Sequence, residues 1–170
     1  MTEETAICKT CRKPKAPYEC GLCHDHMCKA HTQFMTENFS AMRKKVPDEL
    51  KHSTYCINCF DDKVAATLEQ YNDTMEKAKD IILYSKDQSK LTRLIKRKMD
   101  PYKVEGCEDE HEAMMKMSFY AVEDGFNCLI DVQVQTNKII VGSHKKTMFG
   151  ATAVPCTIDP NAIRGHLDPP

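Results

Sequence analysis

The chain has 170 residues, among them 24 basic and 25 acidic residues, ten cysteines and no tryptophan. A formal net charge of −1 removes the whole-chain electrostatic case for nucleic-acid binding that a strongly basic protein offers. No apolar stretch approaches the roughly 20 residues that span a bilayer, and charged residues interrupt the first 15 positions, where a signal peptide has its apolar core. We therefore expect a cytoplasmic protein whose clustered cysteines are metal ligands rather than disulfides.

Seven of the ten cysteines lie within the first 59 residues, in closely spaced pairs. The four pairs are Cys8-x2-Cys11, Cys20-x2-Cys23, Cys28-x2-His31 and Cys56-x2-Cys59. Zinc requires four thiolate or imidazole donors, and a Cys-x2-Cys turn places two of them on one knuckle. Eight donors predict two Zn²⁺ ions per chain, and both sites are structural because protein fills every ligand position.

The order of the pairs favours an interleaved arrangement, in which the first pair joins the third and the second joins the fourth. The predicted ligands are Cys8, Cys11, Cys28 and His31 for the first zinc, and Cys20, Cys23, Cys56 and Cys59 for the second. One alternative stays open: Cys20-x3-His24 is close to a RING-type spacing, so His24 can replace Cys23. We prefer Cys23 because Cys-Gly-Leu-Cys is a knuckle sequence, and we expect His26 and His52 to be surface histidines.

This ligand order resembles the cross-brace treble-clef group of FYVE, PHD and RING fingers, over roughly Ile7 to Phe60. The Cys-x2-Cys, x4, Cys-x2-His core is most similar to a FYVE-type finger. The resemblance implies a two-zinc binding domain. FYVE domains that bind phosphatidylinositol 3-phosphate carry a WxxD element and a basic run around the third ligand, whereas this chain has no tryptophan and reads Ala-Pro-Tyr-Glu before Cys20. These departures argue against that lipid.

The other members of the group also fit incompletely. A PHD finger has histidine as its fifth ligand, but this chain has Cys28, and there is no tryptophan for a methyl-lysine cage. A RING ubiquitin ligase has proline before its eighth ligand, whereas Asn58 precedes Cys59. A zinc-stabilised surface for contacting another protein remains, with a RING-type ligase as the enzymatic alternative.

A helix is predicted to connect this finger (residues 1–60) to the second part of the chain. Asp61 or Asp62 can cap its start. Apolar residues then follow at steps of three and four and form a seam, which consists of Val64, Leu68, Tyr71, Met75, Ala78 and Ile82. Residues 61–79 therefore form a connecting helix, whose seam packs on the protein's own second domain or pairs with a second copy.

Residues 80–158 are predicted to form a small α+β domain, a helix laid on an antiparallel sheet. Lys90 to Lys98 is a basic helical segment, and Asp109 to Asp124 is a helix with Gly125 just past its end. After Gly125 the apolar period falls to two, which indicates strands with one buried face. We expect those strands at 128–135, 139–141 and 147–158, a turn at 136–138, and an irregular tail over residues 159–170.

The segment from Glu123 to Gln135, together with the later Phe149-Gly-Ala-Thr-Ala-Val154, resembles the end of the YbjQ-type heavy-metal-binding domain. The resemblance implies a self-associating α+β domain without established catalysis. It does not lead us to a metal site here. Cys107, Cys128 and Cys156 occur singly, and in strand patterns a free cysteine behaves as a small buried apolar residue.

The sequence contains no nucleophile elbow, phosphate-binding loop or metalloprotease helix. We therefore expect a non-enzymatic zinc-binding adaptor with an unidentified protein partner, which forms homo-oligomers through the connecting helix or the α+β domain. A further alternative is a peripheral binder of anionic lipid or nucleic acid that uses Arg43-Lys44-Lys45 and Lys90 to Lys98. No aromatic residues interleave with the second of these segments, which argues against single-stranded nucleic acid.

Overall fold

The computed structural model describes residues 6–88, 92, 95 and 99–159, and the chain divides into two units, Met1–Asp73 and Thr74–Pro170. It mixes helices with small sheets, which confirms the predicted α+β class. Most of the basic segment Lys90 to Lys98 and nearly all of the tail 159–170 lie outside the described residues. No helix in the described part of the chain combines the length and the apolar character that a membrane crossing requires.

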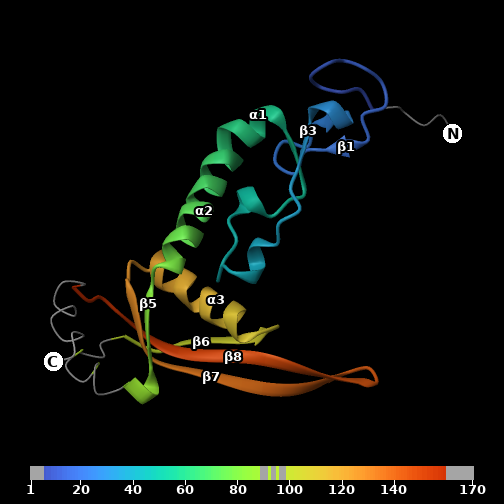
Figure 1. The fold of residues 1–170 in the computed structure, drawn as a ribbon. Helices are drawn as coiled ribbons and strands as arrows, with labels where there is room; N and C mark the ends of the chain where they lie inside the picture. The colour runs from blue at the N-terminus through green and yellow to red at the C-terminus, as the bar shows by residue number, and fades with distance from the viewer. Residues whose placement is uncertain (1–5, 89–91, 93–94, 96–98, 160–170) are drawn as a thin grey trace. The chain divides into compact units, whose positions relative to one another are not determined.

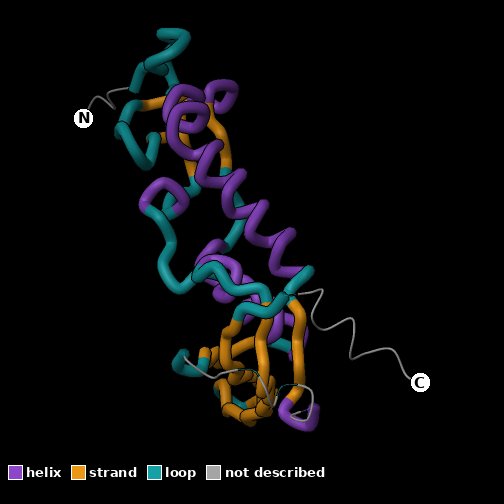
Figure 2. Tube along the Cα trace, turned by 90° about the vertical axis from the view of Figure 1, so that its left-hand side faces the viewer, coloured by secondary structure: helices purple, strands orange, loops and turns teal. Residues whose placement is uncertain are grey.

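The first unit is built mainly from loops, and its strands are very short (Figure 2). Two antiparallel pairs are present, β1 (Tyr18–Glu19) with β2 (His26–Met27) and β3 (Thr32–Phe34) with β4 (Thr54–Cys56). Single 3₁₀ turns connect these strands. The turn η1 (Lys29–His31) lies between β2 and β3, and η2 (Phe39–Ala41) and η3 (Asp48–Leu50) lie between β3 and β4. So little regular structure needs another source of stability, such as bound metal.

The helical stretch begins earlier than predicted. It runs from α1 (Ile57–Cys59) through the π-helical turn η4 (Phe60–Val64) into α2 (Ala65–Lys79). The sulfur of Cys56 accepts a hydrogen bond from the Cys59 backbone N–H at 3.3 Å and so caps the helix. The predicted capping role of Asp61 or Asp62 is wrong, because a cysteine sulfur already takes the acceptor position that an aspartate would fill.

The predicted apolar seam is only partly helical. Val64, Tyr71 and Ala78 are buried on the helical stretch, whereas Ile82 lies beyond its end, in strand β5 (Ile82–Ser85). Tyr71 packs edge-on against Phe39, with ring centroids 4.9 Å apart. The middle of the seam therefore contributes to the core of the first unit.

Among its described residues, the second unit has a four-stranded sheet with the helix α3 (Glu110–Glu123) along one face (Figure 1). Its strands are β5, β6 (Tyr102–Cys107), β7 (Cys128–Val141) and β8 (His144–Cys156), in the order β5-β7-β8-β6. Strands β7, β8 and β6 are antiparallel, as predicted, but β5 pairs with β7 in parallel. The sheet is mixed because the chain returns from β5 to β7 by a long connection that includes α3, and such crossovers produce parallel neighbours.

The predicted turn at 136–138 is wrong. Strand β7 continues to Val141, since Thr136, Asn137 and Lys138 each have a cross-strand partner in β8. The chain reverses at residues 142–143, where Gly142 has a φ of +62°. Two-residue hairpin turns favour glycine because they need this left-handed backbone.

Both ends of α3 are fixed by local hydrogen bonds, which confirms the predicted helix and its glycine stop. At the start, the carboxylate of Asp109 accepts from the Glu112 N–H at 2.7 Å. At the end, Gly125 adopts a φ of +81°, and the N–H groups of Gly125 and Phe126 donate to the carbonyls of Val122 and Ala121. This pair of bonds is the Schellman motif.

The sheet is buried on both faces at the start of β7, where one buried face was expected. Leu129 and its neighbours Cys128 and Ile130 are all fully buried, although successive side chains point to opposite faces. The face opposite α3 is covered by a cluster that contains Tyr84, Cys128, Ile130, Val154, Cys156 and Ile158. Asn127 holds the end of this cluster, because its side-chain amide forms two hydrogen bonds with the Ile158 backbone, at 2.8 and 2.9 Å.

Candidate metal centre

The first group of donors comes from two loops that are distant in sequence. Cys8, Cys11, Cys28 and His31 place their ligand atoms within 4.8 Å of one another. The Cys11 and Cys28 sulfurs are 3.8 Å apart. Nδ1 of His31 lies 3.3 Å from the Cys28 sulfur and 3.7 Å from the Cys8 sulfur, so this ring nitrogen faces the centre of the group.

The second group consists of cysteines alone: Cys20, Cys23, Cys56 and Cys59. Their sulfurs also lie within 4.8 Å of one another, and those of Cys23 and Cys56 are 3.8 Å apart. Both groups have the membership that the sequence analysis predicted from the interleaved order. Each can hold a metal ion.

The spacings within the groups match the size of zinc. Zn–S bonds of about 2.3 Å in a tetrahedron require sulfur–sulfur edges of about 3.8 Å, and a Zn–N bond of about 2.0 Å gives sulfur–nitrogen edges of about 3.5 Å. The sulfur pairs at 3.8 Å meet the first value, and the His31 separations of 3.3 and 3.7 Å bracket the second. Thiolate-rich donor sets of this kind select zinc or another soft metal over magnesium or calcium.

Two knuckles with the same backbone shape present the first pair of each group. The N–H of Arg12 donates to the Cys8 carbonyl, and the N–H of His24 donates to the Cys20 carbonyl, both at 2.9 Å. Arg12 and His24 both have a φ of +60°, a left-handed conformation that is rare outside glycine. The residue after each of these two Cys-x2-Cys pairs, Arg12 or His24, therefore closes the same tight turn.

Backbone contacts between distant loops explain why the pairs interleave. The Gly21 N–H donates to the Thr54 carbonyl at 2.9 Å, and the Thr54 hydroxyl donates to the Glu19 carbonyl at 2.7 Å. These bonds hold the second knuckle beside β4 and its Cys56. The Lys9 N–H donates to the His26 carbonyl at 2.9 Å, which holds the first knuckle beside the strand that precedes Cys28.

The thiols within each group differ in acidity. Hydrogen bonds from the N–H groups of Cys11 and Cys28 lower the pKa of Cys8 to about 5. Backbone hydrogen bonds outweigh desolvation at Cys20 and lower its pKa to about 7. Desolvation, followed by the neighbouring thiols, raises the pKa of Cys23 to about 11 and raises that of Cys59. Cys8 and Cys20 thus ionise more easily than an ordinary thiol, and a bound cation would supply the charge that the thiolates of Cys23 and Cys59 need.

The three remaining histidines near the groups lie outside them. Nδ1 of His24 is 2.7 Å from a Glu19 carboxylate oxygen, and its side chain is 71% exposed. His26 is exposed, and His52 packs edge-on near Tyr55. The structure therefore directs Cys23, and not His24, toward the second group.

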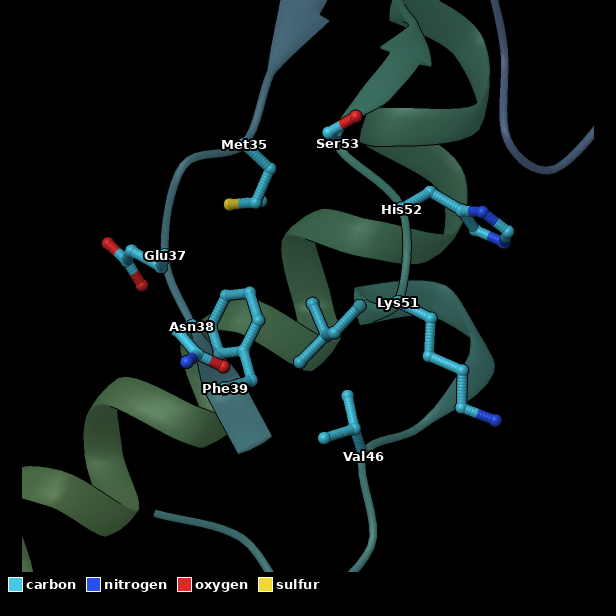
Figure 3. Close-up of a pocket in the computed structure, with 9 residues that line it drawn as sticks. Met35, Glu37, Asn38, Phe39, Val46, Lys51, His52 and Ser53 are labelled. Atoms are coloured by element: carbon cyan, nitrogen blue, oxygen red, sulfur yellow. The ribbon is translucent and has the colours of Figure 1, made fainter. Parts of the chain in front are cut away.

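A groove of about 270 Å³, which no sequence pattern predicted, lies in the first unit (Figure 3). Met35, Phe39 and Val46 surround it and Leu50 contributes to its lining, whereas the Lys51 and His52 side chains extend away from it. Glu37, Asn38 and Ser53 complete the lining. The only sequence signal was a set of apolar residues at irregular spacing in a polar loop, a pattern that no periodicity rule detects.

The remaining candidate residues do not join these groups. Cys107, Cys128 and Cys156 are buried, and none belongs to a metal-ligand group within the described ranges. Cys128 and Cys156 are cross-strand neighbours in the second core. Of the basic residues in the alternative proposal, Lys44 and Lys45 are exposed on the loop after η2, and the lysines of the 90–98 segment lie outside the described residues.

Comparisons with protein-family models, with curated proteins and with solved structures found no match to this chain. The two donor groups, the knuckles and the groove are therefore the basis for a function.

Proposed function

We propose that the chain is a non-enzymatic interaction module, in which two structural zinc ions stabilise a FYVE- or RING-like cross-brace finger that binds a protein partner. The observation that carries the proposal is the pair of interleaved four-donor groups. The YbjQ-like α+β unit and the connecting helix are proposed to support self-association. Several copies of the finger would then raise the apparent affinity for a partner through effective concentration.

The donor sets support a structural role for the metal. A catalytic zinc keeps an open position for water or substrate, whereas each group here supplies four protein donors. Cys8 and Cys20 are fully buried, and backbone N–H groups donate hydrogen bonds to their sulfurs. Zinc binding at such a site contributes on the order of 10 kcal/mol to folding. That amount offsets the small core of the first unit.

The groove supports a protein as the partner. Its lining is apolar at Met35, Phe39 and Val46, and polar at Asn38 and Ser53. An apolar centre with a polar rim is the usual composition of a small peptide-binding surface. A volume of about 270 Å³ accommodates one or two side chains, so the proposed ligand is a short segment with a bulky apolar residue.

Native mass spectrometry of the untagged protein tests the metal part of the proposal, because one spectrum reports metal count and assembly together. We expect two zinc ions per chain and an assembled species. One zinc or none would contradict the cross-brace module, and a monomer at tens of micromolar would contradict self-association. Faster discharge of ubiquitin from charged conjugating enzymes would contradict the non-enzymatic role.

Selection of random peptides against the zinc-loaded protein tests the groove. We expect enriched peptides to share a bulky apolar residue and to bind the double variant Met35→Ser, Val46→Ser at least tenfold more weakly. Ile7→Ser and Lys63→Gln change exposed positions away from the groove and serve as matched controls. Equal binding of the peptides to the groove variant would refute this surface.

A further inference from the structure

The β7–β8 hairpin extends beyond the rest of its sheet (Figure 1). The last pair between β5 and β7 joins Ser85 to Val132, and the last between β6 and β8 joins Cys107 to Phe149. From the Asn137–Met148 pair to the turn, β7 and β8 pair only with each other within the described residues. At about 3.3 Å per residue, this two-stranded arm is roughly 15 Å long.

The arm exposes two large aliphatic side chains near its tip. Ile139 is 41% exposed and Ile140 is 75% exposed. Because the two residues are consecutive in a strand, their side chains point to opposite faces of the ribbon. Ile140 does not pack into the core of the unit, and it is the most exposed large apolar residue of the described part of the chain.

Lysines accompany these isoleucines. Lys146 pairs across the ribbon with Ile139, Lys145 pairs with Ile140, and Lys138 precedes them in β7. No acidic residue occurs between Asp131 and Asp159. The Lys146 ammonium reaches the Glu108 carboxylate at 3.0 Å, whereas Lys138 and Lys145 have no carboxylate partner among the described residues.

We propose that this arm is a docking site for an anionic lipid surface. The Ile139 and Ile140 side chains enter the boundary between headgroups and acyl chains, and Lys138 and Lys145 contact anionic headgroups. Apolar side chains combined with nearby cations are the features that bind proteins to such interfaces. Docking stays shallow, because the outer edges of the two-stranded arm leave backbone polar groups that the hydrocarbon core cannot satisfy.

The positive charge of the arm favours an anionic lipid surface over a second copy of the chain as its binding partner. Two copies that paired along this arm would bring lysines of like charge together, and lysines on a strand edge oppose such pairing. Nucleic acid would match the charge. However, residues 135–148 include no phenylalanine, tyrosine or tryptophan to stack on bases, and exposed isoleucines make no favourable contact with phosphates.

Co-sedimentation of the full-length, zinc-loaded protein with vesicles tests the proposal. We expect binding to phosphatidylcholine vesicles that contain 30% phosphatidylserine and none to phosphatidylcholine alone. The variant Lys138→Gln, Lys145→Gln should weaken binding roughly 25-fold, about fivefold per lysine. The variant Ile139→Ser, Ile140→Ser should weaken it tenfold or more.

Two controls match these variants. Lys63→Gln, Lys77→Gln removes two exposed lysines from the helical stretch, and Ile7→Ser removes an isoleucine that is 59% exposed in the first unit. Both controls should bind as the unmodified protein does. Since the tip side chains are exposed, the test variants should retain the far-ultraviolet circular dichroism of the parent.

The lack of tryptophan in the chain allows a direct readout of insertion. In Ile140→Trp, the single indole should shift its fluorescence to shorter wavelength on addition of phosphatidylserine vesicles and should be quenched by brominated lipid. Unchanged fluorescence of Ile140→Trp would overturn the proposal. Vesicle binding that is the same in the lysine variant, the isoleucine variant and the unmodified protein would also overturn it. It would also be overturned if the isoleucine variant converted an oligomer into a monomer and no variant bound vesicles, since a second copy would then cover the tip.

Discussion

At the scale of single residues, the position of a side chain relative to a tight turn separates ligands from their neighbours. Cys23 and His24 are adjacent, yet the left-handed backbone at His24 turns its ring toward Glu19 while the Cys23 sulfur faces Cys56. Sequence spacing alone left both residues open as ligands. The turn geometry therefore supports a role for Cys23.

Substitution of Cys23 and substitution of His24 are expected to have opposite effects on the number of bound zinc ions. Cys23→Ser removes one donor and should reduce the metal count in native mass spectrometry from two zinc ions to one. His24→Gly retains the left-handed turn without a side chain and should keep both ions. A loss of zinc in His24→Gly, with two ions kept in Cys23→Ser, would reverse the assignment.

Gly21 supports the second knuckle because it leaves room for a neighbouring ring. A Cβ atom at this position would lie 2.2 Å from the Cγ atom of His52. We expect Gly21→Ala to weaken zinc binding at the second site, measured by competition with a chromogenic chelator. The double variant Gly21→Ala, His52→Ala should recover most of the loss; no recovery would show that the contact with His52 is not the cause.

We expect Tyr102 to make the stability of the second unit sensitive to alkaline pH. Burial, followed by the hydrogen bond that its hydroxyl donates to Asp124, raises the pKa of Tyr102. The neutral phenol is favoured in the folded state, so this contribution is complete below the unfolded pKa of about 10 and is lost as pH rises above it.

The free energy of unfolding should therefore fall above pH 10, and it should fall less steeply in Tyr102→Phe. Denaturant titrations between pH 7 and pH 11 measure both slopes. Part of the slope should remain in the variant, since burial also raises the pKa values of Tyr84 and Tyr120. Identical slopes would show that Tyr102 does not contribute.

At the scale of elements, local hydrogen bonds decide where α3 begins and ends. Asp109 satisfies a free N–H at its start, and the left-handed Gly125 lets two N–H groups return to the last carbonyls. These interactions involve residues within about one turn of each other. For that reason the boundaries of this helix could be predicted from the sequence.

Gly125→Ala should reduce the free energy of unfolding by about 1 kcal/mol, because alanine is strained at a φ of +81°. Nothing lies within 4 Å of the added methyl group, so the cost comes from the backbone and not from a clash. His111→Ala, an exposed change inside the same helix, is the control and should alter stability by less than 0.5 kcal/mol. Urea titration measures both variants.

At the scale of the whole molecule, the two units gain stability from different sources. The first unit has short strands around two groups of metal donors. The second unit has a continuous apolar core and hydrogen bonds between Asn127 and Ile158, and its described residues include no group of metal donors. The loss of metal should consequently affect the units unequally.

Removal of zinc with a strong chelator should unfold the first unit and leave the sheet of the second in place. Hydrogen exchange measured by mass spectrometry should show rapid exchange over residues 6–56 and retained protection over 128–134 and 150–156. Readdition of zinc should restore the protection. Equal loss of protection in β7 and β8 would mean that the second unit depends on the metal-bound first unit.

The donor groups, the α+β class, the boundaries of α3 and the glycine at its end could be predicted from the sequence alone. Ligand spacing, caps and periodicity act over a few residues and can be read directly from the order of the side chains. The tertiary structure decided the start of the helical stretch at Ile57, the hairpin turn at Gly142 and the parallel pairing of β5. It also decided the second buried face of the sheet, the groove and the exposed tip. These features depend on partners that are distant in sequence: Cys56 had to cap a helix, β8 had to supply partners for residues 136–138, and Ile158 had to fold back onto Asn127.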